Sequence, residues 1–129
     1  RDNYMKHYLN RDICHANKTE YIMVDKIANK NAREYINRCE DFTGNNTFGQ
    51  REVNQYIVYS YSTHFPMYVY DYTTQEWYEN SDKYSRTTSK HQSQCRPRFE
   101  IAREFNTKDL IKLIDKGSLA EWVKWKAVA

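Results

Sequence analysis

The residues from Val53 to Glu79 decide the fold, and their sequence is VNQYIVYSYSTHFPMYVYDYTTQEWYE. The stretch is rich in β-branched and aromatic side chains, which suit a pleated and half-buried surface. We expect strands over residues 53–62, 67–72 and 75–79, separated by short turns. Strands that follow one another so closely along the chain predict a small antiparallel three-stranded meander.

Tyrosine dominates this region, with eight of the chain's twelve tyrosines between residues 56 and 84. Side chains alternate along a strand, so Met67 and Val69 are expected to face the core. The tyrosines that alternate with them, Tyr68, Tyr70 and Tyr72, are expected to face the other way. Five phenols would then form one partly open patch for a partner protein. They are Tyr59, Tyr61, Tyr68, Tyr70 and Tyr72. The alternatives are that the tyrosines are ordinary half-buried sheet residues, or that Trp122 and Trp125 cover them.

The charges around the predicted meander are strongly segregated. Residues 53–82 carry four carboxylates and no basic side chain, whereas residues 83–98 carry five basic side chains and no carboxylate. One interpretation is that the two segments face each other and neutralise their charges. The other is that the basic segment faces a phosphate group or an acidic protein. Residues 80–98 are also poor in large apolar groups, which predicts a loop with at most a short helix or strand. Candidate partner-binding residues in it are Lys83, Arg86, Thr87, Thr88, Ser89, Lys90, His91 and Arg96.

Apolar residues at three- and four-residue spacing predict helices before the meander. We expect a short helix over residues 4–13 and a longer one over 19–39. The turn-forming residues 43–46 predict a stop, with Gly44 as its left-handed cap.

Helical periodicity returns in the last third of the chain. Asn106 or Thr107 caps a predicted helix that Gly117 ends, and a capping box at Ser118 opens another. The segment from Phe99 to Phe105 fits either a strand or a helix. The fold class is therefore α+β, with a small antiparallel meander flanked by N-terminal and C-terminal helices.

The 129 residues are the size of one domain, and no linker or repeat divides them. This domain would have three parts: a helical part over residues 1–44, a meander with a basic loop over residues 53–97, and a helical part over residues 99–129. With three glycines in all, a glycine-rich phosphate loop is excluded, and no nucleotide or other cofactor is expected. No apolar run approaches the roughly 20 residues of a membrane helix, so no membrane partner is expected. Three widely spaced cysteines predict a reduced, cytoplasmic protein.

Histidine supplies two further interpretations. His64, His91 and Cys95 are the only plausible metal ligands, but a fourth ligand is not evident, so no metal site is predicted. His64 and His91 could instead be the acid and base of a metal-independent ribonuclease, with Lys90 or Arg86 stabilising the phosphorane. This enzyme is kept as an alternative function.

The central motifs resemble a family of short, uncharacterised bacteriophage proteins. The resemblance rests on Ser60-Tyr61-Ser62-Thr63, on Trp77-Tyr78 and on Lys83-Tyr84-Ser85-Arg86-Thr87-Thr88-Ser89-Lys90-His91. It covers about residues 54–97, a third of the chain. It implies phage origin and action in the cytoplasm of an infected bacterium, and it carries no established activity.

These features predict a non-enzymatic binding protein that inhibits or redirects a bacterial host protein or nucleoprotein complex. Host takeover and defence evasion, including inhibition of CRISPR, are the roles that the phage resemblance implies. The second hypothesis is direct nucleic-acid binding through residues 83–98, and the third is the ribonuclease. Salt separates the first two, because phosphate binding weakens steeply with added salt.

Overall fold

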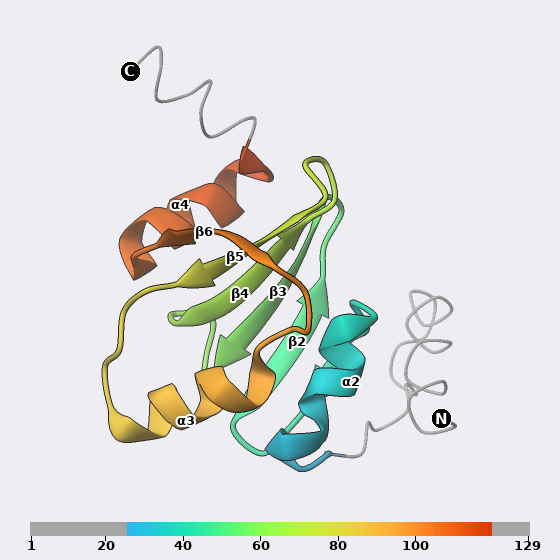
Figure 1. Ribbon diagram of the computed structural model, residues 1–129, viewed down its shortest axis with the longest axis vertical. Coiled ribbons are helices and arrows are strands. Elements are labelled where there is room, and N and C mark those ends of the chain that lie inside the picture. Colours follow the sequence, from blue (N-terminus) through green and yellow to red (C-terminus); the bar gives the residue numbers. More distant parts are fainter. Residues whose placement is uncertain (1–25, 120–129) are drawn as a thin grey trace, which may run out of the picture.

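The computed structural model describes residues 26–119, which form a six-stranded mixed sheet with helices on both faces (Figure 1). The strands follow one another across the sheet in chain order. They are β1 (Phe42–Thr43), β2 (Thr47–Arg51), β3 (Gln55–Ser60), β4 (Pro66–Asp71), β5 (Glu76–Asn80) and β6 (Ile101–Phe105). Neighbouring strands are antiparallel except β5 and β6, which are parallel.

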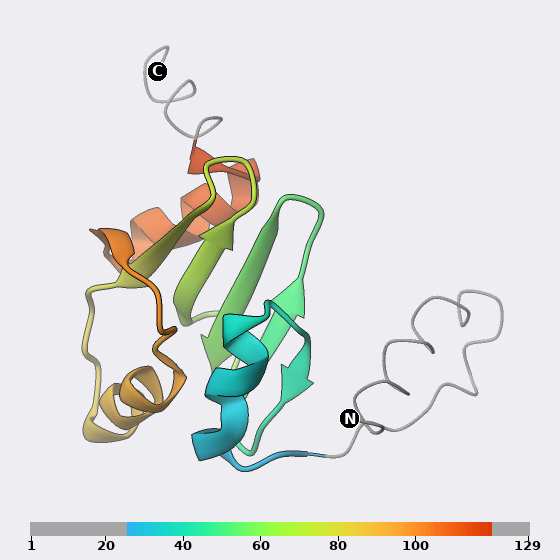
Figure 2. The same ribbon diagram turned by 45° about the vertical axis from the view of Figure 1, so that its right-hand side comes forward.

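Helices form a layer on each face of the sheet (Figure 2). On one face lie the short 3-10 helix η2 (Asn29–Asn31), α2 (Ala32–Asn37) and α3 (Arg86–Cys95). On the other lies α4 (Thr107–Lys116). The parallel pairing of β5 and β6 requires a crossover connection, and α3 lies within it.

Two hydrophobic clusters hold these three layers together. The α2–α3 side contains Ala32, Ile36, Phe42, Tyr56, Val58, Phe65, Met67, Tyr68, Trp77 and Cys95. The α4 side contains Ile57, Tyr59, Val69, Tyr78, Leu110, Leu113 and Leu119. All six residues of β3 are buried as a result.

The α+β class is confirmed, but the three-stranded meander is only the centre of a larger sheet. The three predicted strands correspond to β3, β4 and β5. The additional strands are β1, β2 and β6. They extend the sheet on both sides, and β6 makes it mixed rather than purely antiparallel.

Before the meander, the predicted helical stretch is largely replaced by strands. Within the described part of the 19–39 prediction, the helices are η2 and α2, which end at Asn37. Gly44 is not a left-handed cap, and Phe42–Thr43 pairs with β2 instead of ending a helix. A Cβ at Gly44 would lie 2.7 Å from the Asn29 side chain, so this glycine permits a close approach. The helix expected over 4–13 lies outside the described residues.

The helix predicted from Asn106 to Gly117 is confirmed as α4. Asn106 Oδ1 accepts a hydrogen bond from the Asp109 backbone N–H at 2.8 Å, and Gly117 ends the helix with φ of 93°. These are the N-cap and the left-handed C-cap that the sequence indicates. The helix expected after Ser118, with Trp122 and Trp125, lies outside the described residues apart from its start.

The expected division between a core face and an open tyrosine face is wrong for β4. The β3–β4 register shifts so that Val58 pairs with Tyr68 and Tyr59 with Pro66, leaving Met67 as an extra residue in β4. A bulge of this kind brings Met67 and Tyr68 into the same cluster. Because helices cover both faces, neither set of side chains forms an open row.

We expect Tyr68→Ala to destabilise the protein by about 3–5 kcal/mol, as truncation of a core aromatic does. Tyr68 is 1% exposed, and its hydroxyl donates a 2.7 Å hydrogen bond to the Gln92 carbonyl oxygen of α3. Urea denaturation measures the effect, with Val53→Ala as the control because Val53 is 91% exposed. A loss for Tyr68→Ala no larger than that of the control would contradict the assignment of this ring to the core.

Candidate interaction surface

The basic segment is an α-helix rather than the predicted loop. Ser85 caps α3, since its Oγ accepts from the Thr88 backbone N–H at 3.1 Å. Thr88 Oγ1 accepts in return from the Ser85 backbone N–H at 3.0 Å. This reciprocal capping satisfies two backbone donors that a helix start leaves unpaired. The Thr-Thr-Ser-Lys-His run is therefore the first half of α3.

The buried side of α3 consists of Thr88, His91, Gln92 and Cys95, most of which are polar. His91 Nδ1 and Ser60 Oγ are 2.7 Å apart in a buried hydrogen bond to the end of β3. Gln92 Nε2 donates to the Asn80 carbonyl oxygen at 3.1 Å, at the end of β5. These bonds attach α3 to two strands, and they bring together Ser60 and His91 from separate motifs.

The outward side of α3 carries the unpaired positive charge. Lys83, Arg86 and Lys90 are exposed and make no ion pair within residues 26–119. Arg96 differs, because its Nη1 lies 2.8 Å from Glu79 Oε2. The basic and acidic segments therefore neutralise each other at this one pair, while three cations before and along α3 face solvent. Thr87 is exposed and Ser89 half-buried beside them.

The five candidate tyrosines lie in different environments. Tyr59 and Tyr68 are 6% and 1% exposed and belong to opposite faces of the sheet. Tyr70 and Tyr72 are half-buried against the α2–α3 side. Only Tyr61 is largely exposed, at 57%, so the expected patch of five phenols does not form.

Tyr61 lies between α3 and the β1–β2 turn. Its ring is 5.3 Å from the His91 ring, and its backbone N–H donates to the Asn46 carbonyl oxygen at 2.8 Å. Its φ of 69° lies in the left-handed region, which is unfavourable for a bulky L-residue. Neighbouring contacts therefore hold Tyr61 in a conformation that its backbone alone does not prefer.

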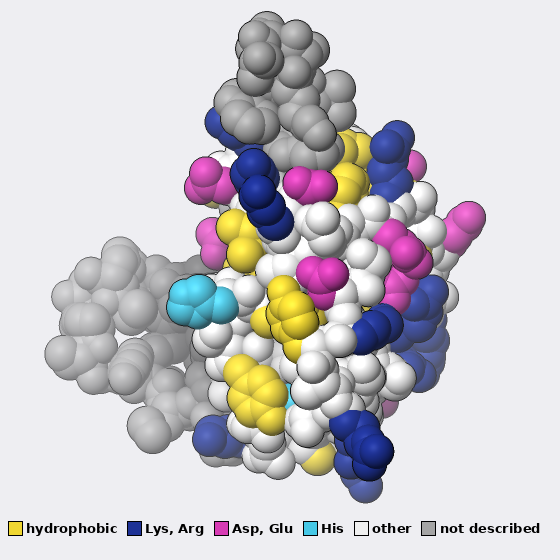
Figure 3. Space-filling view, turned by 90° about the vertical axis from the view of Figure 1, so that its left-hand side faces the viewer, with side chains coloured by type: hydrophobic (Ala, Val, Ile, Leu, Met, Phe, Trp, Pro, Cys, Tyr) yellow, Lys and Arg dark blue, Asp and Glu magenta, His cyan; other side chains and the backbone are white. Residues whose placement is uncertain are grey.

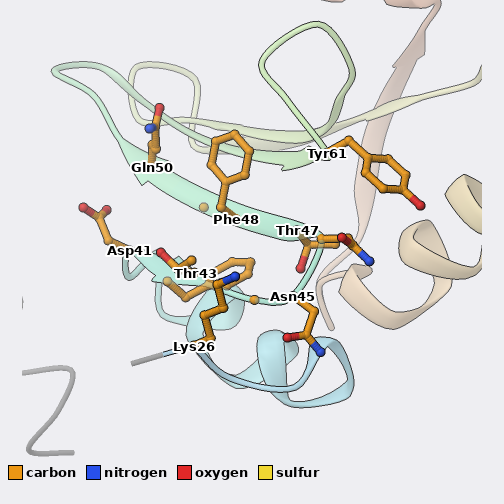
Figure 4. A pocket seen from close by; sticks show the side chains of 12 residues that line it. Lys26, Asp41, Thr43, Asn45, Thr47, Phe48, Gln50 and Tyr61 are labelled. Carbon is orange, nitrogen blue, oxygen red and sulfur yellow. The ribbon is translucent and has the colours of Figure 1, made fainter. Parts of the chain in front are cut away.

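A pocket of about 370 Å³ adjoins Tyr61 over β1 and β2 (Figure 4). Tyr61 and Asn45 lie at one end of it, and Asp41 and Gln50 lie at the other. Phe48 contributes an aromatic wall between these ends. The pocket extends the exposed region around Tyr61 away from α3.

Tyr84 is a second exposed aromatic, and it was absent from the predicted site. It is 62% exposed, its ring is 4.8 Å from that of Phe65, and its hydroxyl donates to Thr107 Oγ1 at 3.1 Å. Its place directly before the Ser85 cap was the available signal, since a hydrophobic residue at that position commonly packs near the start of the helix. We define the α3 surface as Tyr61, Lys83, Tyr84, Arg86, Thr87 and Lys90.

Figure 3 shows the side of the molecule that contains the β5–α3 connection. Hydrophobic side chains lie among Lys and Arg side chains in the lower part of this view, and most of its acidic side chains lie higher. Exposed hydrophobic and arginine side chains together are common in protein-binding surfaces.

The histidines do not form the metal set that the sequence offered. Within residues 26–119, no three His, Cys, Asp or Glu side chains are placed to hold a metal ion. Cys95 is fully buried, and burial raises the pKa of its thiol to about 12. His64 is exposed, whereas His91 is 3% exposed and bound to Ser60. An acid–base role for His91 would require its ring to become accessible to substrate.

Comparisons with protein-family models, with curated proteins and with solved structures found no match. No helix within residues 26–119 is long and apolar enough to span a bilayer.

We expect His91 to make the stability of the fold depend on pH. Burial, and secondarily the charge of Lys90, lower the pKa of His91 below its usual 6.5. Above pH 6.5 both folded and unfolded chains hold the ring neutral. As the pH falls below this value, the unfolded chain binds the proton first, so the free energy of unfolding decreases.

Urea midpoints at about pH 7.5 and about pH 5.5 measure this dependence. His91→Asn keeps a hydrogen-bonding group near Nδ1 but does not titrate in this range, so its midpoint should fall less than that of the wild type. His64→Asn is the matched control, because His64 is exposed and its replacement should leave the fall unchanged. Equal falls in the wild type and His91→Asn would refute the assignment.

Proposed function

We propose that this chain is a non-enzymatic binding protein that docks on a bacterial protein or nucleoprotein complex through the α3 surface. The resemblance of residues 54–97 to small bacteriophage proteins supports a role in host takeover or in blocking a defence system such as CRISPR. The residues that carry this resemblance include all six residues of the α3 surface, from Tyr61 to Lys90.

Tyr61 is the observation that carries the proposal. A left-handed φ costs a bulky residue about 1–2 kcal/mol, and Asn or Gly would fill the position at lower cost. Among the described residues 26–119 the ring contacts that of His91, and it remains 57% exposed. A tyrosine at such a position fits a role for its side chain in binding, since backbone strain is concentrated at functional sites.

The cations of α3 supply charge on the outer side of the helix whose His91 contacts the Tyr61 ring. Arg86 and Lys90 are four residues apart and thus on the same side of the helix. The capping box and the buried hydrogen bonds of α3 fix the helix on the sheet, which lowers the entropic cost of ordering these groups on binding. A partner with an acidic surface and an apolar recess for tyrosine would match them.

A protein partner fits these observations better than a nucleic acid does. Three cations on the α3 surface are few for a surface that follows a phosphate backbone. Of the other two cations of residues 83–98, Arg96 is neutralised by Glu79, and Arg98 lies beyond the end of α3. Exposed tyrosine and arginine side chains are instead enriched at the centre of protein interfaces.

The proposal predicts that Tyr61→Asn abolishes partner binding and leaves the melting temperature unchanged or raised. Asn tolerates the left-handed conformation, so the variant removes the ring and relieves backbone strain together. Removal of a central tyrosine from an interface costs about 2 kcal/mol or more. Binding is measured by affinity capture from bacterial lysate, and the melting temperature by calorimetry.

A double charge reversal is the second arm of this test. Arg86→Glu with Lys90→Glu should abolish capture, whereas Lys108→Glu with Lys112→Glu, at the same spacing on α4, should not. Capture that survives nuclease treatment identifies a protein partner. Capture that nuclease abolishes would instead support the nucleic-acid alternative. In that case log K should fall with the logarithm of the salt concentration, with a slope of about −3 for three phosphate contacts. Equal loss in both double variants would argue against a specific surface.

The ribonuclease alternative makes a separate prediction. If the chain is not an enzyme, the purified wild type leaves RNA intact over hours, as do His64→Ala and His91→Ala. Cleavage by the wild type that is lost in both variants would establish the alternative. Cleavage that persists in both variants would indicate a contaminating nuclease.

A further inference from the structure

A second cavity, away from the α3 surface, lies on the α2 side of the sheet. It has a volume of about 780 Å³, within the range of pockets that hold small molecules. It forms where the end of α2, the turn between β4 and β5, and the start of β6 meet. We call it the aromatic cleft, because its lining includes Tyr70, Tyr72, Trp77 and Phe99.

The rings of the cleft are inclined to one another rather than stacked. The Tyr70 and Tyr72 rings lie 5.3 Å apart at an interplanar angle of 79°. The Tyr70 and Trp77 rings lie 5.2 Å apart at 53°. Trp77 is 4% exposed and belongs to the core, so it anchors the group, whereas Phe99 is 53% exposed at the rim. Rings at such angles present their faces in several directions, which suits a rounded group better than a flat one.

Each of the two arginines in the lining has a carboxylate beside it from outside the cleft. Arg38 Nη2 lies 3.0 Å from Glu40 Oε1. Asp41 Oδ1 accepts a 2.8 Å hydrogen bond from the backbone N–H of Arg51, which places a negative charge next to this residue. Neither Glu40 nor Asp41 belongs to the lining. The two positive charges are therefore offset without help from the carboxylates of the cleft itself.

The two carboxylates of the lining leave the charge of the cleft negative. Glu76 and Glu100 are exposed, and neither forms an ion pair within the described part of the chain. Glu76 directly precedes Trp77, Glu100 directly precedes Ile101, and Trp77 pairs with Ile101 across the parallel strands β5 and β6. The two carboxylates thus come from neighbouring positions of adjacent strands, where like charges repel. Glu76 also accepts a 3.2 Å hydrogen bond from the Tyr78 hydroxyl, but this neutral donor does not cancel its charge.

An alkylated ammonium ion has the properties that such a lining favours. Its positive charge is attracted to the faces of aromatic rings, which is how aromatic cages recognise quaternary ammonium groups. A primary ammonium is compact and strongly hydrated, whereas alkyl groups around the nitrogen make the ion easier to remove from water. The nearby carboxylates add attraction for any cation and would repel an anion.

We propose that the aromatic cleft is a binding site for a small organic cation that bears an alkylated ammonium group, held against the rings of Tyr70, Tyr72 and Phe99 and beside Glu76 and Glu100. This site is separate from the α3 surface. It does not depend on the function proposed above.

Three probes that share one branched shape but differ in charge test the proposal. Choline carries a trimethylammonium group, 3,3-dimethylbutan-1-ol has a neutral carbon in place of the nitrogen, and 3,3-dimethylbutanoate carries a carboxylate. Titrations of the full chain are followed by NMR chemical shifts. We expect choline to bind at least about fivefold more tightly than the alcohol, because a cation over aromatic faces gains about this much, and the carboxylate to bind more weakly still. Equal binding of choline and the alcohol, tighter binding of the carboxylate, or no binding of choline would overturn the proposal.

Variants then locate the site. Glu100→Gln should weaken choline binding about threefold, whereas Glu104→Gln makes the same charge change on β6, outside the lining, and should have no effect. Phe99→Leu should weaken it about threefold and leave the melting temperature unchanged, since Phe99 is exposed and leucine keeps an apolar side chain without an aromatic face. Wild-type affinity in Glu100→Gln and Phe99→Leu, or equal weakening in Glu104→Gln, would show that choline binds elsewhere and would overturn the assignment.

Discussion

Burial of β3 on both faces is the constraint on which the remaining architecture depends. Each of its six residues is buried, including the polar Gln55 and Ser60. A strand of this kind needs a strand on each edge and a helical layer on each face. The α4 helix supplies one layer with Leu110 and Leu113, while α2 and α3 share the other. The tyrosines that flank this strand therefore become core residues instead of a surface row.

Helix α3 itself faces the sheet mainly with polar side chains, and hydrogen bonds attach it to the strands. Buried polar groups are costly unless they are paired, and the Ser60–His91 pair and the Gln92 amide N–H have partners on the strands. Because such bonds are directional, they fix the rotation and position of α3 more narrowly than apolar packing would. A helix fixed in this way presents the residues on its outer side in a defined arrangement, which is what a binding surface requires.

The parts of the fold that the sequence predicted are those with a strong local signal. α4 has an Asn cap, an apolar stripe and a terminal glycine, and β3 to β5 have dense β-branched and aromatic residues. α3 was missed because its buried side is Thr88, His91, Gln92 and Cys95, which gives no apolar periodicity. β2 was missed because Gly49 interrupts a short strand. Yet a Cβ there would collide with the Phe42 ring and the Tyr56 hydroxyl, so the glycine is required by tertiary packing.

The candidate site was predictable to a similar extent. Exposure of Arg86 and Lys90 followed from charge alone, whereas the burial of Tyr59 and Tyr68 depends on helices from distant parts of the chain. The left-handed residues give a more local criterion. Within residues 26–119, the non-glycine residues with positive φ are Cys39, Tyr61 and Gln75. Cys39 directly follows the end of α2 and Gln75 lies in the turn between β4 and β5, where left-handed residues have an ordinary structural role. Tyr61 differs because it is bulky and its ring is exposed, so its backbone supports the α3 surface by an argument that does not use charge.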